Sequence, residues 1–379
     1  MRVLVTGGAG FIGSHTADAL LAEGHDVRIL DNLAAPVHRE HVLPPYVSRD
    51  VEWIDGDVRD RAAWDRAVRG VEAIFHLAAY QDYLVNYARF FEVNVVSVGH
   101  MYEALAATHA DVGRVVYASS QAVYGDGLYR CPTGHVEPFT APGRTEASLA
   151  AGDWDVHCPA CGCECLPVWA EESQAHPQNA YALSKRAGEE STLVLGARDR
   201  IEATALRYSI VQGPRQSPWN AYSGALRIFA QRARAGVPAV CYEDGQQLRD
   251  YTNIADVVSA NLVALRHPAA PGSAFNVGGG KAVTVLELAQ AVTAATGSEV
   301  PPELPGMYRV GDSRHSLSNT ARLEALGWHA SVPMAESVAQ YVEWLGGIDV
   351  PLDVVTDADR HMRADGVTKT VTNSARAEK

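Results

Sequence analysis

A tyrosine and a lysine stand four residues apart in the segment NAYALSKRAGEE, and this spacing places Tyr181 and Lys185 on one face of a helix. An ammonium group beside a phenol favours the phenolate and lowers the pKa of the phenol from its usual value of about 10. Such a phenolate can take the proton of a sugar hydroxyl and later return it. Because any surface helix can carry this pair, the catalytic interpretation needs support from other residues.

Two serines supply part of that support. Ser119 and Ser120 end the apolar segment VVYASS and are followed by QAVYGD. If this segment is a strand of a parallel sheet, its carboxyl end borders the crevice in which ligands bind. A serine hydroxyl at this position therefore faces the ligand.

A cluster of glycines indicates a dinucleotide site near the first residues. In TGGAGFIG, Gly7, Gly10 and Gly13 recur at every third position between an apolar segment and a helical one. This pattern lets the backbone turn tightly and approach a pyrophosphate at the positive end of the helix. A tight structural turn is the alternative interpretation.

An acidic residue strengthens the dinucleotide interpretation. Asp31 ends the next apolar segment, at the spacing of about 20 residues that this type of site requires. Its carboxylate would accept hydrogen bonds from both ribose hydroxyls and repel a 2′-phosphate, which favours NAD over NADP. Asp57 in DGDVRD is a second acidic candidate, which either contacts the adenine or caps a helix.

Alternating strands and helices would position these residues. Short apolar segments alternate with helical ones in the first half of the chain, which predicts an α/β fold with a Rossmann-type doubly wound parallel sheet. The expected strands are Val3–Val5, Val27–Leu30, Ala73–Leu77, Val115–Ala118 and Ala203–Leu206, and the expected helices are Ser14–Glu23, Phe91–Thr108 and Tyr181–Leu195.

The chain of 379 residues is long enough for about two domains. We expect a nucleotide-binding domain over 1–206 and a smaller α+β substrate domain over 207–349. The stretch 127–176 is rich in Pro, Gly, Cys and Trp and breaks the alternation, so we interpret it as an insert with a function of its own. Residues 350–379 are predicted to form a polar tail.

Charge and hydropathy exclude some classes of function. A formal net charge of −13 argues against nucleic-acid binding, which needs a basic face. We find no apolar run of about 18 residues and no signal peptide, so we expect no membrane span and a cytoplasmic location.

Several segments together resemble one family, the extended short-chain dehydrogenases/reductases, and within it the nucleotide-sugar epimerases and dehydratases. The matching segments occur in the family's order from residue 1 to about 347: TGGAGFIG, HLAA, SSQAVYG, YALSK, LRYSIVQGPRQ, LRDYTNIADV and RVGD. The resemblance implies an NAD-dependent enzyme that acts on nucleotide-diphosphate sugars. It also implies a homodimer, in which each chain pairs two long helices with its partner, here Phe91–Thr108 and Tyr181–Leu195.

The same resemblance implies roles for individual residues. Tyr181 would be the base, Lys185 its activator and Ser120 the hydroxyl that orients the reacting oxygen. Gln81, Arg249 and Arg309 would contact the substrate, the two arginines at its pyrophosphate, although an arginine often forms only a surface ion pair. The resemblance implies that Tyr181 and Lys185 also contact the cofactor. The other implied cofactor-binding residues are Gly7, Gly10, Phe11, Ile12, Gly13, Asp31, Asn32, Asp57, Val58, Leu77, Ala78, Ala79 and Asn94. The alternative role of Asn94 is to cap a helix.

The family shares a first step, oxidation of a sugar hydroxyl to a ketone, and differs afterwards. Dehydratases that resemble this chain carry Asp-Glu after the catalytic hydroxyl residue, whereas Gln121 and Ala122 stand here and neither titrates. We therefore predict a 4-epimerase, in which the ketone turns over and takes its hydrogen back on the other face. A dehydratase, reductase or decarboxylase of this family and a non-catalytic NAD-sensing regulator are the alternatives.

Two positions bear on how the sugar would be bound: one differs from the residue that relatives have, and the other affects the room in the sugar pocket. Many members of the family have Asn two residues after Tyr208, where this chain has Ile210. The resemblance therefore implies sugar contacts that differ from those of UDP-galactose 4-epimerases. Ser316 aligns with a position that gates the sugar pocket, and its small side chain would leave room there.

Five of the six cysteines are concentrated in the insert. Cys158 and Cys161 form a C-P-x-C-G turn that can present two thiolates to one ion, and Cys131 and His135 can complete a tetrahedral zinc site. Cys163 and Cys165 are rival ligands, and reduced thiols with a redox-sensing role are the alternative. The segments YRCP, CPACG and PQNAYALSK are similar to a subgroup associated with dTDP-L-rhamnose 4-epimerase, which suggests dTDP-L-rhamnose and dTDP-6-deoxy-L-talose as substrates.

Overall fold

The computed structural model describes residues 1–82, 85–220, 224–351 and 353–371. Its largest element is a seven-stranded sheet in the order β12-β9-β5-β4-β1-β2-β3, in which all neighbouring strands run parallel. Strand β1 is buried from its second residue onward because both faces of the sheet are covered, which suits short runs of Val, Ile and Leu. The predicted Rossmann-type sheet is confirmed. Its strands are β1 Arg2–Thr6, β2 Asp26–Asp31, β3 Glu52–Asp55, β4 Ala73–His76, β5 Arg114–Ser120, β9 Glu202–Tyr208 and β12 Ser273–Val277.

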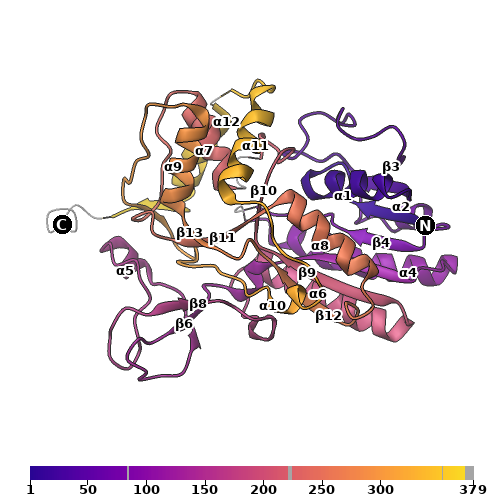
Figure 1. Ribbon diagram of the computed structural model, residues 1–379, viewed down its shortest axis with the longest axis horizontal. Helices are drawn as coiled ribbons and strands as arrows, with labels where there is room; N and C mark the ends of the chain where they lie inside the picture. The colour runs from indigo at the N-terminus through magenta and orange to yellow at the C-terminus, as the bar shows by residue number, and fades with distance from the viewer. Residues whose placement is uncertain (83–84, 221–223, 352, 372–379) are drawn as a thin grey trace.

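Helices cover both faces of this sheet (Figure 1). Helices α1 and α8 pack on one face and α2, α4 and α6 on the other, each over its own apolar core. The segment Phe91–Thr108 is helical as expected, but it begins with a five-residue π-helical segment, η1, that joins α3 directly to α4. The bounds are α1 Phe11–Ala22, α2 Arg61–Ala67, α3 Tyr87–Phe91, η1 Glu92–Val96, α4 Ser97–Thr108, α6 Ala180–Asp199 and α8 Ile254–Arg266.

A second region contains a three-stranded sheet in the order β10-β11-β13 and has its own apolar core. Helices α7, α9, α11 and α12 gather over it, as Figure 1 shows. The chain returns from this region to the main sheet at α8 and β12, which lie within the range 207–349 assigned to the second domain. The division of the chain into two domains at residue 206 stays a prediction. The bounds are β10 Ile210–Gln212, α7 Ala225–Arg234, β11 Leu248–Asn253, β13 Ala282–Thr284, α9 Val285–Thr296, α10 Ala321–Glu324 and α11 Met334–Gly346.

The insert forms a small unit of its own that stands to one side of the main sheet (Figure 1). It contains an antiparallel sheet in the order β7-β6-β8 and a small core that includes Tyr129, Cys131 and Cys158. Its elements and the short helices beside it are η2 Gln121–Tyr124, β6 Leu128–Arg130, β7 Phe139–Thr140, α5 Glu146–Ala150, β8 Leu166–Val168 and η3 Glu172–Gln174.

Part of the expected polar tail adopts regular structure. Helix α12 (Asp353–Ala364) buries Val355 and Met362, and β15 (Thr368–Thr370) pairs antiparallel with β14 (Met307–Arg309). The stretch therefore packs on the strand that carries Arg309; residues 352 and 372–379 lie outside the described part. Among the described residues, no helix has the length and apolar character needed to span a bilayer.

Candidate active site at the carboxyl ends of the parallel strands

The glycine turn joins β1 to α1 and leaves no room for side chains. Gly7 has a φ of +67°, and a Cβ atom there would lie 2.8 Å from the backbone nitrogen of Ala78. A Cβ atom on Gly13 would lie 2.1 Å from the carbonyl oxygen of Gly7. The turn thus keeps the N-terminus of α1 open at the sheet edge, which is where a pyrophosphate binds in this type of fold. Phe11 and Ile12 form the first turn of α1.

Asp31 lies beside this turn, at the carboxyl end of β2. Its carboxylate accepts hydrogen bonds from the backbone N–H of Ala9 at 3.0 Å and of Leu33 at 2.9 Å. Burial raises the pKa of Asp31, and the two N–H donors and His38 oppose that rise. The contacts fix the carboxylate next to the glycine turn, as the predicted ribose contact requires.

Asn32 and Asp57 lie together on the same side of the site. The amide of Asn32 donates to the Asp57 carboxylate at 2.8 Å. Burial alone would raise the pKa of Asp57, but hydrogen bonds from Arg59 and Asn32 outweigh it and the pKa is lowered. Asp60, not Asp57, caps the N-terminus of α2, so the alternative role of Asp57 as a helix cap is wrong.

The HLAA segment begins at the last residue of β4, His76, and adjoins the glycine turn. The backbone N–H of Ala78 donates to Thr6 Oγ1 at 3.2 Å, and Leu77 is half-buried while Ala79 is exposed. Asn94 is fully buried within η1, and its amide donates to the backbone oxygen of Tyr80 at 3.0 Å and to Ser184 Oγ at 2.9 Å. Asn94 therefore ties the HLAA side of the site to α6 and caps no helix. Val58 is buried in the core beneath α2, and Gln81 is exposed.

The catalytic candidates lie where α6 packs against the end of β5. Tyr181 is half-buried in the first turn of α6, which Asn179 caps by accepting the N–H of Ala182 at 2.9 Å. Ser120 is the last residue of β5, and its Oγ accepts the N–H of Ala122 at 3.1 Å. The two elements are in contact, so the structure brings a phenol and a hydroxyl to the same edge of the sheet.

Lys185 lies one turn further along α6 and is almost fully buried, with 2% of its surface exposed. Its Nζ donates to the Ala118 backbone oxygen at 2.9 Å and lies 5.4 Å from the centre of the Tyr117 ring. Burial lowers the pKa of Lys185 to about 7. The ammonium is thus held between β5 and α6, on the face of α6 that carries Tyr181.

A buried ion pair beneath these residues was not predicted from the sequence. Arg207 and Glu189 are each 1% exposed and form two hydrogen bonds, of 2.9 and 2.6 Å. Glu189 also accepts from Ser119 Oγ at 2.6 Å, and Arg207 donates to Tyr124 Oη at 2.8 Å. The pair joins α6, β5, β9 and η2 behind the catalytic candidates. In the sequence, the only indication that Glu189 belongs to this site is its position four residues after Lys185, on the same face of the helix.

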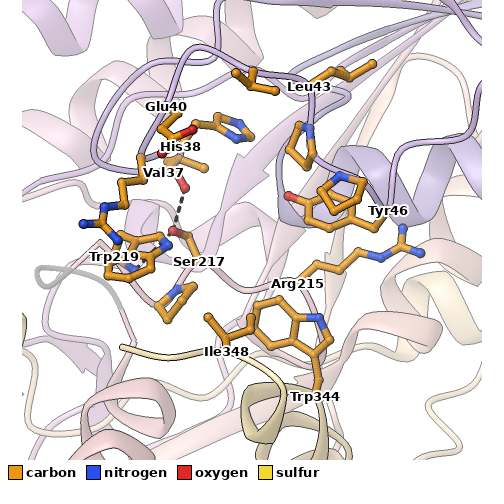
Figure 2. Close-up of a pocket in the computed structure, with 15 residues that line it drawn as sticks. Val37, His38, Glu40, Leu43, Tyr46, Arg215, Ser217, Trp219, Trp344 and Ile348 are labelled. Carbon is orange, nitrogen blue, oxygen red and sulfur yellow. Dashed lines mark hydrogen bonds between the residues drawn. The ribbon is translucent and has the colours of Figure 1, made fainter. Parts of the chain in front are cut away.

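A pocket of about 270 Å³ adjoins the cofactor side of the site (Figure 2). It is lined by the loop after β2, by residues 215–219 and by the end of α11. Ser217 Oγ donates to the Val37 backbone oxygen at 2.6 Å, and Tyr46 Oη donates to the Ala9 oxygen of the glycine turn at 3.0 Å. The catalytic candidates do not line this pocket.

The two predicted substrate arginines occupy different settings. The Arg249 guanidinium donates to the backbone oxygens of Ser313 at 2.8 Å and of Arg314 at 3.0 Å, so it holds a loop of the chain itself. Arg309 ends β14 with its guanidinium 4.8 Å from the centre of the Tyr242 ring and 3.8 Å from the carboxylate of Asp312. Ile210 is half-buried in β10, and Ser316 bridges to the backbone of Arg249.

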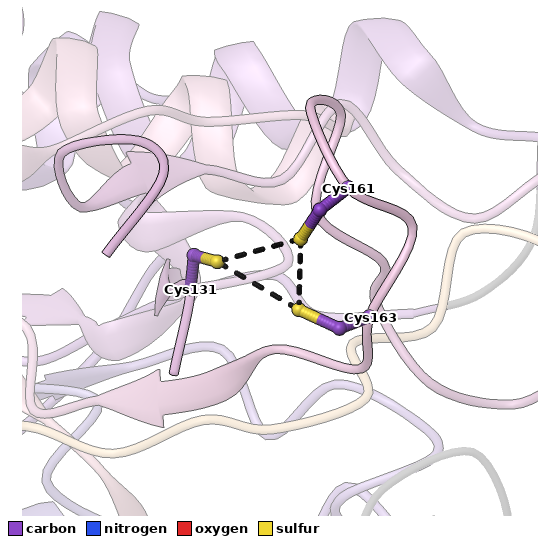
Figure 3. Close-up of side chains that lie close together, drawn as sticks. All are labelled: Cys131, Cys161 and Cys163. Carbon is purple, nitrogen blue, oxygen red and sulfur yellow. Dashed lines mark hydrogen bonds between the residues drawn. The ribbon is translucent and has the colours of Figure 1, made fainter. Parts of the chain in front are cut away.

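Three cysteine sulfur atoms of the insert lie together (Figure 3). Cys131 Sγ lies 3.7 Å from the sulfur atoms of Cys161 and Cys163, which are 3.2 Å from each other. The sequence predicted Cys131, His135, Cys158 and Cys161 as ligands; the structure groups two of these with the rival Cys163. Cys158 interacts with the thiols of Cys131 and Cys161, and these two thiols also raise the pKa of His135.

The chain is similar in sequence to proteins of one family. The sequence model of the NAD dependent epimerase/dehydratase family matches residues 3–147 and 166–278, and so omits the part of the insert that carries four of its cysteines. A dTDP-L-rhamnose 4-epimerase of Burkholderia thailandensis is 31% identical over 91% of this chain and 94% of that protein.

Solved structures agree with this match. The UDP-glucose 4-epimerase of Thermotoga maritima with UDP-glucose has a TM-score of 0.74 and 26% identity over 91% of this chain and 99% of its own. The UDP-glucose 4-epimerase of Thermus thermophilus in complex with NAD has a TM-score of 0.71 and 32% identity over 92% of this chain and 100% of its own.

Proposed function

The chain belongs to the NAD dependent epimerase/dehydratase family, and on that premise we propose that it is an NAD-dependent nucleotide-sugar 4-epimerase. The observation that carries the proposal is the packing of α6 on β5, which brings Tyr181, Lys185 and Ser120 to the sheet edge that holds the glycine turn and Asp31. This arrangement unites a proton acceptor, its activating ammonium and a dinucleotide site.

The residues present fit NAD. Side chains at Gly7 or Gly13 would collide with the chain's own backbone, so glycine there permits the tight turn that brings the start of α1 to the sheet edge, where the pyrophosphate of NAD would bind. The carboxylate of Asp31 is fixed beside the turn and would meet the ribose hydroxyls. When bound, NAD supplies a reversible acceptor for the hydrogen that leaves C4 with its electron pair.

Tyr181 and Ser120 act on the C4 hydroxyl of the sugar. Ser120 orients the hydroxyl oxygen, and the phenolate oxygen of Tyr181 takes the hydroxyl proton while C4 becomes a ketone. The Lys185 ammonium, held between β5 and α6, favours the phenolate. After the ketone has presented its other face, Tyr181 returns the proton to the oxygen, and no net oxidation remains.

The residues after Ser120 favour epimerisation over dehydration. Removal of water from the ketone needs an acid and a base beside the sugar. Gln121 and Ala122 stand at that position, and the amide oxygen of Gln121 accepts a hydrogen bond from Ser318 at 3.4 Å. Neither side chain can exchange a proton.

We propose dTDP-L-rhamnose and its 4-epimer, dTDP-6-deoxy-L-talose, as the sugar pair. Support comes from the 31% identity to the enzyme from Burkholderia thailandensis and from the Cys-containing insert. The test incubates the enzyme, without added cofactor, with UDP-, dTDP- and GDP-sugars and resolves the products by NMR. Inversion at C4 supports the proposal; only dehydrated, decarboxylated or reduced products would contradict it.

A structural zinc ion in the insert is part of the proposal. With Zn–S bonds of about 2.3 Å, sulfur ligands of a tetrahedral site lie about 3.8 Å apart. The separations of 3.7 Å from Cys131 to Cys161 and Cys163 are close to that value, whereas the 3.2 Å between Cys161 and Cys163 is shorter than it. Cys158 and His135 compete for the fourth position. Metal analysis of the purified protein tests the site: one zinc ion per chain is expected, and metal-free protein with the same fold would favour reduced thiols instead.

We also propose that the chain forms a homodimer through α6 and the α3–η1–α4 segment. Apolar side chains are exposed on these packed elements, among them Tyr87 at 60%, Val96 at 47% and Val194 at 66%. Burial of such side chains against a second copy would stabilise the pair. Val194→Glu should shift the protein towards monomer in analytical ultracentrifugation; an unchanged mass would place the interface elsewhere.

A cytoplasmic location completes the proposal. The six cysteines are free thiols in this structure, and free thiols persist in reducing compartments. Cell fractionation tests the location.

A further inference from the structure

Four charged side chains are buried where the insert meets the second region. They are Asp126 after η2, Arg144 of the insert, Glu243 before β11 and Arg314 after β14; each is less than 5% exposed as a residue or side chain. We refer to these four residues as the buried ion cluster. None of them was among the residues predicted to act on substrate or cofactor.

The members of the buried ion cluster contact one another and two carboxylates at its edge. Arg144 lies 2.8 Å and Arg314 lies 3.0 Å from separate oxygens of Glu243. Arg314 also forms two hydrogen bonds with Asp244, of 2.6 and 2.9 Å, and one of 2.9 Å with Asp155 of the insert. The cluster thus joins the insert to the second region by charge.

The buried ion cluster also holds the main chain of the 310–316 loop. Arg144 donates to the Asp312 backbone oxygen at 2.7 Å, and Asp126 accepts the backbone N–H of Arg314 at 2.7 Å. The Ser313 hydroxyl between them donates to the Gly125 backbone oxygen at 2.9 Å. Three consecutive residues of the loop are therefore fixed by side chains or backbone from outside it.

The same contacts connect the two ends of the predicted substrate site. The 310–316 loop directly follows Arg309, the predicted pyrophosphate contact, and the backbone N–H of Glu243 donates to Met307 of the same strand at 2.6 Å. At the other end, Gly125 and Asp126 directly follow η2, which begins after Ser120. The cluster therefore sets the separation between the catalytic hydroxyl and Arg309.

The composition of this joint is informative. Burying charged groups costs more free energy than it returns unless their geometry is excellent, and an apolar joint of the same size is often as stable. Buried ion pairs are expected in place of apolar contacts where the distance between two parts of a binding site must be specific. A nucleotide sugar imposes such a spacing, because its C4 must reach Tyr181 while its diphosphate reaches Arg309.

We propose that the buried ion cluster positions Arg309 for the substrate diphosphate, with Arg144 as the positioning residue that the insert contributes. The proposal rests on the proposed function in assigning the diphosphate to Arg309. It gives the insert a role in substrate affinity in addition to its own folding.

The experiment uses the holoenzyme and compares Arg144→Met, Arg144→Lys and the wild type. Binding of dTDP and of UDP is measured by calorimetry, together with KM, kcat and bound NAD. Arg144→Met should raise the dissociation constant of the preferred nucleotide and the KM about tenfold, with kcat and bound NAD close to wild type, because Tyr181 and the glycine turn are untouched. Arg144→Lys should recover part of the affinity by restoring the charge beside Glu243.

A milder pair of variants covers the case in which Arg144→Met does not fold. Asp155→Asn removes the carboxylate that the insert offers to Arg314 and should raise the dissociation constant about threefold. Asp153→Asn, in the same loop, loses only its contact with His157 and should leave the affinity unchanged.

Distinct results overturn each proposal. The positioning role would be overturned by a folded Arg144→Met protein with wild-type nucleotide affinity, or by equal effects of Asp155→Asn and Asp153→Asn. It would also be overturned if both Arg144 variants lost kcat and bound NAD equally. If the wild type inverts no nucleotide sugar yet nucleotide affinity responds as expected, the proposed reaction is wrong and the positioning role stands.

Discussion

The cofactor edge and the insert side of this molecule are held together by different forces. The cofactor edge comprises the ends of β1, β2 and β5 with α1 and α6, and it rests on two large apolar cores. The insert side comprises residues 127–176 and the 310–316 loop, and it rests on a small core, a group of thiols and the buried ion cluster.

The difference indicates how each side serves the reaction. At the cofactor edge, backbone turns and strand ends place the groups proposed to react, and apolar cores support these elements. On the insert side, charged side chains hold the loop that follows Arg309, the proposed diphosphate contact, so the geometry there depends on the partners of those charges. Chemistry and substrate affinity should therefore respond to different substitutions.

The largest effect is expected from Tyr181→Phe. Loss of the proton acceptor should lower kcat by about a thousandfold or more, within the range for removal of a general base. Tyr87→Phe, at an exposed tyrosine of α3, is the control and should retain activity. Turnover is measured by NMR, and bound NAD should be equal in both. An active Tyr181→Phe protein would contradict the assignment of the base.

Asp31→Asn tests the cofactor edge at its other end. The amide keeps the shape of the carboxylate but removes the charge that repels a 2′-phosphate. The preference for NAD over NADP, as a ratio of dissociation constants, should fall by about tenfold or more, since a hydrogen bond to a charged group contributes about 1.5–3 kcal/mol. Asp26→Asn, at the exposed start of β2, is the control. An unchanged ratio in Asp31→Asn would refute the ribose contact.

The sequence predicted the cofactor edge well because its determinants are local. The glycine turn, the strand ends and the Tyr181–Lys185 spacing each lie within a few neighbouring residues. The π-helical segment η1 was not predicted because the apolar pattern of a π-helical turn differs little from that of the helices beside it. Strand β3 and helix α2 were not predicted, since β3 is partly exposed and α2 is only seven residues long.

The insert side was predicted only in outline because its contacts join distant residues. Asp126 and Arg314 are 188 positions apart, and Arg144 and Asp312 are 168 apart. No local pattern connects such pairs. For the thiols, spacing identified Cys158 and Cys161 with Cys131 to complete the set, but the structure groups Cys131 and Cys161 with Cys163, whose position depends on how the turn folds.

Removal of the proposed zinc ion should affect the insert side alone. A zinc chelator should raise the KM for the nucleotide sugar about tenfold and leave bound NAD unchanged, because the cofactor edge has its own cores. A variant with both Cys131→Ser and Cys161→Ser should show the raised KM without chelator and no further response to it. Parallel loss of NAD and kcat would show that the two sides are not independent.

The smallest effect concerns the stability of cofactor-free protein. Burial lowers the pKa of Lys185 to about 7, so between pH 7 and the usual lysine pKa the unfolded chain binds a proton that the folded chain does not. Stability from this group therefore rises with pH in that window. Lys185→Met should raise the melting temperature at pH 6 by several degrees and by less at pH 9. An equal shift at both pH values would contradict the buried ammonium.

The most direct measurement of the central claim follows the hydrogen on the inverted carbon. A nucleotide sugar carrying deuterium at C4 is converted in ordinary water, and the epimeric product is examined by NMR and mass spectrometry. The account predicts that the product retains its deuterium at C4, because the hydrogen leaves and returns within the closed site. Deuterium lost to the solvent would show that C4 is inverted by deprotonation, and the account would be contradicted.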